Sequence, residues 1–174
     1  MAIAEILFHE IADGDVRKFN AESNDADTGG GARDLRFSLR FEAVLDRFFP
    51  QDAIKEGRKS YRLGDFVYKD TDGQMKVQRN IHYDFQPTNA RPNELRICQL
   101  SKVPFFQQLP ELQPGDGRLF VAFIRMTEGL PQMQFFTERQ ILDKNSNALI
   151  AAEMRDAIEH TRKGNSVVVA VEMI

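Results

Sequence analysis

Along much of the chain, apolar and polar residues alternate with a period of two, a pattern typical of strands with one buried face. Residues 35–39 show it clearly, since Leu35, Phe37 and Leu39 alternate with polar residues, which give the strand a basic outer face. The same alternation, or continuous apolar and β-branched runs, predicts further strands at 3–11, 18–22, 65–69, 75–83, 95–100, 118–126, 132–136 and 166–173.

Two longer segments instead have the apolar spacing of amphipathic helices. The first covers residues 41–49 and is stopped by Pro50. The second covers about residues 147–163 and ends before Gly164. A shorter helical turn is expected at 104–109. The Asp72-Gly73 pair predicts a tight turn between two strands.

These elements predict a mainly β (α+β) fold. The strands cluster in hairpins and do not alternate with long helices, which favours an open antiparallel barrel of about seven or eight strands with short helices. The 174 residues suit a single domain, 1–174. Its C-terminal helix (about 147–163) would be followed by a buried closing strand (about 166–173).

The charge distribution along the chain is uneven. The net charge of −3 argues against a purely electrostatic nucleic-acid binder. Residues 1–32 carry −5, residues 33–96 carry +3, and residues 97–174 carry −1. The basic middle allows one positive face and predicts modest non-specific DNA affinity. A solvated surface of mixed sign explains the same numbers.

The sequence predicts a cytoplasmic protein without a membrane span. There is no run of about 18 apolar residues, and the N-terminus lacks the basic start of a signal peptide. Cys98 is the only cysteine, so an intramolecular disulfide is impossible.

The residues that usually carry enzyme chemistry are scattered. The three histidines, His9, His82 and His160, are far apart in the sequence, and no nucleophile elbow or lysine-terminated phosphate loop is present. His82 and Asp84 would share one face of a strand, where a structural hydrogen bond is expected. We therefore predict no catalytic residue, no metal site and no cofactor.

Residues 24–32 form a loop that contains three consecutive glycines. Thr28 could donate a hydrogen bond to a phosphate, and Gly30 and Gly31 allow the backbone to approach one closely. Arg33 and Arg36 follow, and arginine can bind guanine or phosphate in a bidentate manner. A flexible loop with ordinary surface arginines is the alternative.

A second basic segment covers residues 88–96. It contains four side chains that can read base edges: Arg91, Asn93, Glu94 and Arg96. Asparagine pairs with adenine, glutamate accepts from cytosine, and arginine prefers guanine. Together with the glycine loop, this segment raises the prospect of DNA recognition. Lys76 and Arg79 are the candidates for additional phosphate contacts.

Several stretches resemble the N-terminal effector-DNA-binding domain of EcoRII-type restriction endonucleases. They are SNDADTGGGARDLRF from residue 23, FEAVLDRFFP from residue 41, ARPNELRICQ from residue 90 and RLFVAFIRM from residue 118. The resemblance covers about residues 5–140. It implies a DNA-binding pseudobarrel that grips the major groove between two arms.

Carried over by this resemblance, the first arm would follow the glycine-rich turn and contain Arg33, with Arg36 or Phe37 near its end. The second arm would be the basic segment 88–96, in which Arg91, Glu94 and Arg96 match charged positions of the family and Asn93 matches its asparagine. The chain departs from the family at three places: Ala32-Arg33 replaces a histidine-glutamine pair, Leu95 replaces a lysine, and Pro92 is inserted. These changes make a different target sequence the expectation.

The family's nuclease domain has no counterpart in this sequence, so the resemblance implies recognition without cutting. We therefore expect a double-stranded DNA-binding module that reads a short or modified site, is linked to restriction or phage defence, and works with a separate nuclease or other defence partner. A protein-interaction or small-ligand barrel on the same fold is the alternative.

Overall fold

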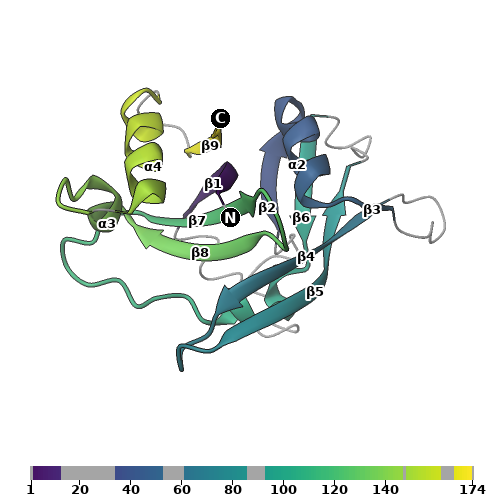
Figure 1. The fold of residues 1–174 in the computed structure, drawn as a ribbon, viewed down its shortest axis with the longest axis horizontal. Helices are drawn as coiled ribbons and strands as arrows, with labels where there is room; N and C mark the ends of the chain where they lie inside the picture. Colours follow the sequence, from purple (N-terminus) through teal and green to yellow (C-terminus); the bar gives the residue numbers. More distant parts are fainter. Residues whose placement is uncertain are drawn as a thin grey trace, which may run out of the picture. The chain divides into compact units, whose positions relative to one another are not determined.

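The computed structural model describes residues 2–12, 34–52, 61–85, 93–146, 148–161 and 167–173. These residues form a mainly β structure with short helices (Figure 1), and their paired strands within each unit run antiparallel. The predicted fold class is therefore confirmed. The chain falls into two compact units: unit 1 comprises Met1–Asp13 and Leu109–Ile174, and unit 2 comprises Gly14–Gln108. That the whole chain folds as a single domain stays a prediction.

Unit 1 contains a four-stranded antiparallel sheet in the order β8-β7-β1-β9. Its strands are β1 (Ile3–Ile11), β7 (Leu119–Met126), β8 (Gln132–Thr137) and β9 (Val168–Glu172). Two helices, α3 (Glu138–Leu142) and α4 (Leu149–Glu159), follow β8 in the sequence. Because β1 pairs with both β7 and β9, the two ends of the chain meet in one sheet.

One apolar cluster joins the sheet of unit 1 to its helices. Ile6 and Phe8 of β1 are fully buried beside Phe120 of β7, and Met154 of α4 closes the cluster. The Phe8 and Phe120 rings meet edge to face with centroids 6.1 Å apart. Burying a side chain of this size contributes roughly 1.5–3 kcal/mol, so this cluster is the main source of stability in unit 1.

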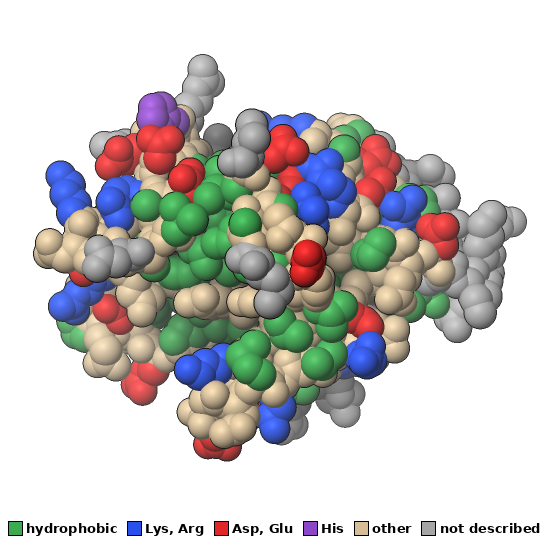
Figure 2. All heavy atoms as spheres, in the orientation of Figure 1, with side chains coloured by type: hydrophobic (Ala, Val, Ile, Leu, Met, Phe, Trp, Pro, Cys, Tyr) green, Lys and Arg blue, Asp and Glu red, His purple; other side chains and the backbone are tan. Residues whose placement is uncertain are grey.

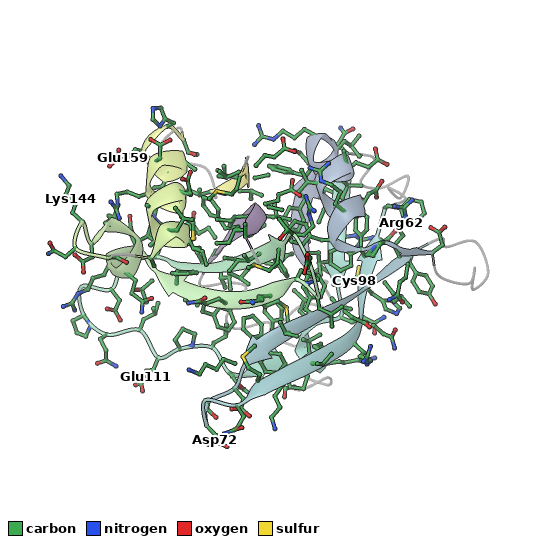
Figure 3. All side chains as sticks on the ribbon, viewed as in Figure 1. Arg62, Asp72, Cys98, Glu111, Lys144 and Glu159 are labelled. Carbon is green, nitrogen blue, oxygen red and sulfur yellow. The ribbon has the colours of Figure 1, made fainter. Side chains whose placement is uncertain are left out.

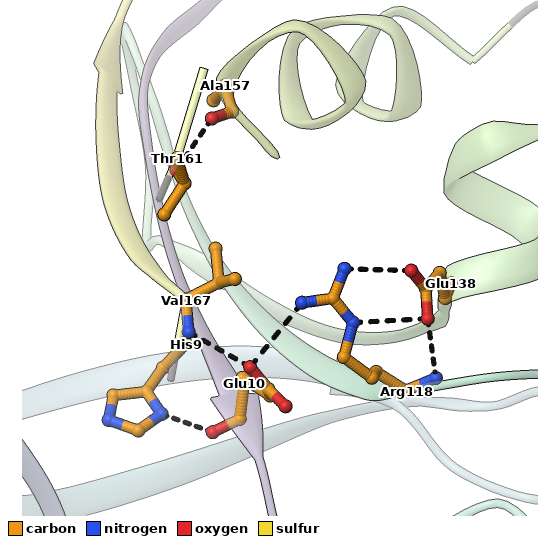
Figure 4. Close-up of polar contacts among 7 residues, drawn as sticks. All are labelled: His9, Glu10, Arg118, Glu138, Ala157, Thr161 and Val167. Carbon is orange, nitrogen blue, oxygen red and sulfur yellow. Dashed lines mark hydrogen bonds and ion pairs between the residues drawn. The ribbon is translucent and has the colours of Figure 1, made fainter. Parts of the chain in front are cut away.

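A polar network fastens the start of α3 to the sheet (Figure 4). Arg118 donates from Nη2 to Glu138 Oε1 at 2.7 Å and from Nε to Glu138 Oε2 at 3.1 Å. Its Nη1 lies 3.7 Å from Glu10 Oε2, and that carboxylate accepts the backbone N–H of Val167 at 2.9 Å. Arg118 thus links β1 to α3, and Glu10 extends this network to Val167, the residue before β9.

Unit 2 contains a five-stranded antiparallel sheet in the order β2-β6-β5-β4-β3. Its strands are β2 (Leu35–Ser38), β3 (Gln51–Asp52), β4 (Arg62–Lys69), β5 (Met75–Asp84) and β6 (Glu94–Cys98). The short helices are η2 (Leu39–Phe41), α2 (Glu42–Phe48), η3 (Leu100–Lys102) and η4 (Pro104–Gln107).

Aromatic rings fill the core of unit 2. Phe49 lies after α2, and its ring packs in a tilted arrangement against Phe66 of β4 and Tyr83 of β5, with centroid distances of 5.3 and 5.4 Å. Gly64 of β4 lies directly beneath the end of α2: a Cβ built there would lie 2.7 Å from the carbonyl oxygen of Phe48. The missing side chain is therefore what allows helix and strand to approach.

Most of the predicted elements are present in the described residues, although the short elements β3 and η3 were not predicted and further elements differ. The strand at 35–39 ends at Ser38, and Leu39 is an exposed residue of η2 because the chain turns there into α2. Strand β9 is half-buried and not fully buried as predicted: it pairs with β1, and Val169 and Val171 pack against the core cluster of unit 1. The helix α3 was not predicted. The strand expected at 18–22 lies outside the described residues.

The helices in the described part of the chain are all too short or too polar to cross a membrane.

Candidate functional site

Strand alternation gives unit 2 one apolar and one polar face. On β5, Ile81 and Tyr83 are buried in the core, whereas His82 between them points to the opposite side. On β6, Leu95 and Ile97 are buried in the same way. The intervening residues therefore share the side of the sheet that faces away from the core.

The strand register brings these intervening residues together. Arg96 lies opposite Arg36 of β2 on one side and opposite Asp84 of β5 on the other. Cys98 lies opposite His82. We use the term polar face for the following set: Asp34, Arg36, Tyr61, His82, Asp84, Glu94, Arg96 and Cys98.

Arg96 is the centre of the polar face. Its Nη1 lies 3.6 Å from Asp34 Oδ2, and its Nη2 lies 3.3 Å from Asp84 Oδ2. Only 17% of its side chain is exposed. A guanidinium held between two carboxylates in a partly dry site is well fixed in position, because each charge is compensated where it is desolvated.

Arg36 also forms an ion pair, but this pair is longer and more exposed to solvent than those of Arg96. Its Nη1 lies 3.8 Å from Glu94 Oε1, and both side chains are about one-third exposed. The polar face therefore carries two arginines and three carboxylates. Figure 2 shows the same interspersion of positive and negative side chains on the face of the molecule that it displays. This set of residues is therefore mixed in charge, as in the alternative of a surface of mixed sign.

A cavity of about 240 Å³ opens on this face. Two aromatic rings line it: Tyr61 stacks on His82, with ring centroids 4.4 Å apart and planes 16° from parallel. Gln99 closes one side in a left-handed conformation with φ 59° and donates its backbone N–H to Asp34 Oδ1 at 3.2 Å. The lining residues are Asp34, Tyr61, His82, Asp84, Arg96, Cys98 and Gln99.

Burial shifts the pKa values of two side chains that line the cavity, Asp34 and Cys98. It raises the pKa of Asp34, against the opposing effect of the Gln99 backbone N–H and of Arg96. Burial, with Asp34 and Asp84 nearby, raises the pKa of Cys98 to about 12. Figure 3 labels this residue on β6. A thiol that stays protonated is a poor nucleophile, so the cavity is better suited to binding than to covalent catalysis.

The predicted DNA-contacting residues fall into three groups. Five of them lie outside the described residues: Thr28, Gly30, Gly31, Arg33 and Arg91. Arg36, Glu94 and Arg96 lie together on the polar face. Asn93 is exposed and comes directly before β6.

Lys76 and Arg79 form the third group, and they are separate from the polar face. They precede Asp84 on β5 by eight and five residues, which corresponds to roughly 26 and 17 Å along a strand. Lys76 Nζ lies 3.6 Å from Asp70, and Arg79 Nη1 lies 2.7 Å from Asp65. Both cations are thus paired within the β4–β5 hairpin.

Parts of the two proposed arms are neighbours in the sheet. Residues 35–37 of the first arm belong to β2, and residues 94–96 of the second arm belong to β6, which pairs with β2. Leu35 lies opposite Ile97, and Ser38 lies opposite Glu94. Asp34, which precedes β2, and Asn93, which precedes β6, therefore lie at opposite ends of this strand pair, and these ends are about 10 Å apart along the strands.

The sequence interpretation missed the cavity. It placed His82 and Asp84 on one face of a strand, but it did not bring Asp34, Tyr61 or Cys98 to the same place. The alternation of polar and apolar residues in 81–84 and 95–98 was the available signal. Alternation does not show which strands are neighbours, so the site became visible only with the register.

A second hollow, of about 570 Å³, lies on unit 1 beside Asp116, Glu138 and Asp143. Glu138 is already engaged by Arg118. Among the residues that the structure describes, there is no group of three or more histidine, cysteine or carboxylate side chains arranged to hold a metal ion. The polar face of unit 2 is therefore the stronger candidate site.

No protein-family model matches the chain, and no curated protein matches it either. The resemblance to EcoRII-type effector domains therefore stays a prediction.

Proposed function

We propose that this protein is a double-stranded DNA-binding module that reads base edges in the major groove with two arms rooted in unit 2. The first arm comprises residues 28–37 and the second arm residues 88–96. In this proposal the module recognises a short or modified site without cutting it, and works beside a nuclease in restriction or phage defence.

The pairing of β2 with β6 carries the proposal. It makes the described parts of the two arms neighbours, and the two ends of the strand pair are about 10 Å apart along the strands. The major groove of B-DNA is about 12 Å wide. Two arms with this spacing match the dimension of one groove, whereas arms on distant strands would not.

The charges of the polar face favour base contacts over phosphate contacts. Its three carboxylates would repel phosphates but can accept hydrogen bonds from the amino groups of cytosine and adenine. Arg36 is the most accessible cation there, because its pair with Glu94 is long and partly solvated. The remaining positive charge of the arms comes from Arg33 and Arg91.

Selection of bound duplexes from a random pool tests the proposal directly. We expect a shared short sequence and binding tighter than micromolar at low salt. Arg33→Ala and Arg36→Ala should each weaken binding to the selected duplex by about 1–3 kcal/mol and relax the preference at one position. Fluorescence anisotropy with the selected and a scrambled duplex measures both effects.

Arg139→Ala is the matched control. Arg139 is an exposed arginine of unit 1, and its Nη1 lies 3.9 Å from Asp116 Oδ1, so its ion pair is similar in length to that of Arg36. This variant should bind the selected duplex like the unchanged protein. Arg96→Ala is a less direct test of base contact, because it also removes the cation between Asp34 and Asp84 and so can destabilise the fold. Its DNA affinity must therefore be compared together with its stability, measured by urea unfolding. If no duplex binds better than micromolar at low salt, the proposal is wrong and the ligand-binding alternative takes its place.

A further inference from the structure

The cavity on the polar face is lined by residues that belong to or adjoin both proposed arms. Asp34 directly follows segment 13–33, and Asp84 lies two residues before segment 86–92. Both carboxylates line the cavity, and Arg96 bridges them. A duplex held between the arms would therefore lie over the cavity mouth.

The cavity combines the groups that recognise a single flat heterocycle. The stacked rings of Tyr61 and His82 provide an aromatic surface, and base–aromatic stacking is favourable for every base. Asp34 and Asp84 provide carboxylate oxygens, which accept from exocyclic amino groups. Arg96 provides a fixed donor for a ring carbonyl.

The size and dryness of the cavity fit the same ligand. About 240 Å³ is below the usual 300–1,000 Å³ of drug-sized pockets, so it suits one small ring system and not a larger ligand. The partial burial of Asp34 and Arg96 makes their hydrogen bonds to a ligand stronger than they would be in open water. A base that lacks a matching amino group would leave a partly buried carboxylate without a hydrogen-bond donor, so it should bind in the cavity more weakly.

From this arrangement we propose that the cavity receives one nucleobase extruded from the bound duplex, and that it selects a base with an exocyclic amino group and a carbonyl on the same edge, separated by one ring nitrogen, as in cytosine. The inference rests on the proposed DNA-binding function and adds to it the way in which one position of the site is read. Extrusion costs a few kcal/mol of stacking and pairing, least for a mismatched base.

The test uses a duplex selected by the full chain, with 2-aminopurine placed beside each cytosine in turn. A 2-aminopurine whose stacking neighbour leaves the duplex loses a quenching contact, so we expect fluorescence to rise severalfold beside one cytosine on binding. A mismatch at that cytosine should tighten binding, because no base pair then has to be broken when the base is extruded. Replacing the cytosine–guanine pair there by a uracil–adenine pair removes the amino group without creating a mismatch and should weaken binding about tenfold.

Variants of the cavity separate its role from that of the arms. Tyr61→Ala should abolish the fluorescence rise and the mismatch effect, whereas Tyr61→Phe keeps the ring and should retain both. Asp84→Asn should reduce the preference for cytosine over uracil. Thermal unfolding of each variant, beside Lys144→Ala as an exposed control, establishes that the fold is intact.

The outcomes distinguish the two proposals. If the duplex binds but no position gains fluorescence and no mismatch tightens binding, base extrusion is wrong and the DNA-binding function stands. If Tyr61→Phe fails as completely as Tyr61→Ala, stacking in the cavity is wrong. If no duplex binds at all, both proposals are wrong.

Discussion

Single residues in unit 2 are fixed by contacts that leave no space for substitution. Gly64 is the clearest case, because it faces a backbone carbonyl that belongs to the end of a helix. A flexible side chain could move aside, but the backbone at Phe48 is held by the packing of Phe48 and Phe49 in the core. The smallest residue is therefore required where α2 crosses β4.

Gly64→Ala should lower the free energy of unfolding by about 1–3 kcal/mol, the usual cost of overpacking a well-packed site. Its Cβ would lie 2.7 Å from the Phe48 oxygen and 2.8 Å from the Phe49 and Phe66 rings. Urea denaturation measures the change, with Lys69→Ala, an exposed substitution on the same strand, as control. A change as small as that of the control would contradict the packing described here.

Cys98 should be almost inert toward alkylation in the folded protein. Its pKa is raised from 9.0 to about 12 by burial and the two neighbouring aspartates. At pH 8 the thiolate fraction is then about a thousand times smaller than that of the ordinary thiol, and alkylation needs the thiolate. Iodoacetamide labelling followed by mass spectrometry, with and without urea, measures the difference. Equal rates in both conditions would show that the thiol is accessible and ionised.

At the scale of elements, polar side chains decide where the short helix α3 begins. Thr137 and Gln140 form a capping box, in which the Thr137 hydroxyl accepts the Gln140 N–H at 3.2 Å and the Gln140 side chain accepts the Thr137 N–H at 2.8 Å. The sequence Thr-x-x-Gln was visible at 137–140 as a helix start signal. A five-residue helix is too short to show apolar periodicity, so only this cap could have predicted it.

The ion pair between Arg118 and Glu138 should make the stability of unit 1 depend on pH. Hydrogen bonds from Arg118 lower the pKa of Glu138 below its ordinary 4.5. Because the folded state holds the carboxylate ionised, this stabilisation is present above pH 4.5 and is lost as the pH falls through the lowered folded-state pKa. Glu138→Gln should cost about 1 kcal/mol at pH 7, since Arg118 is one-third exposed and the pair is screened.

The measurement is urea unfolding of Glu138→Gln and of the unchanged protein at pH 7 and at successively lower pH. The difference between the two proteins should shrink as Glu138 becomes protonated. Glu111→Gln, at an exposed carboxylate, serves as control. A difference that stays constant down to pH 3 would mean that the charge of Glu138 is not what stabilises the start of α3.

For the whole molecule, the decisive property is that the described cations predicted to contact DNA are already paired with carboxylates. Arg36, Lys76, Arg79 and Arg96 each have an acidic neighbour within 4 Å. Releasing such a pair to bind phosphate exchanges one ion pair for another and gains little. Specific binding must then depend on base contacts and on the few cations contributed by the arms.

The affinity for a selected duplex should therefore depend weakly on salt. Two or three phosphate contacts predict a slope of roughly −2 to −3 for log K against log salt concentration. Arg33→Ala should reduce the magnitude of this slope by about one if that residue contacts a phosphate. A slope steeper than about −6 would show that the paired arginines and lysines are released to the DNA.

The sequence by itself determined the strands, the turns and the fold class. Alternation in 35–38 and 81–84 fixes which residues face the core, and Asp72-Gly73 fixes a turn in which Gly73 has φ 79°. These features depend on neighbours in the chain, so local chemistry is sufficient to predict them.

Only the tertiary structure decided which polar residues share a site. Asp34 precedes Asp84 and Arg96 by 50 residues or more, and the β2-β6-β5 order brings both carboxylates within ion-pair distance of Arg96. The same order pairs the predicted DNA-contacting arginines with acids that are distant in sequence. Strand order depends on how all the apolar faces of unit 2 pack at once, which no local pattern encodes.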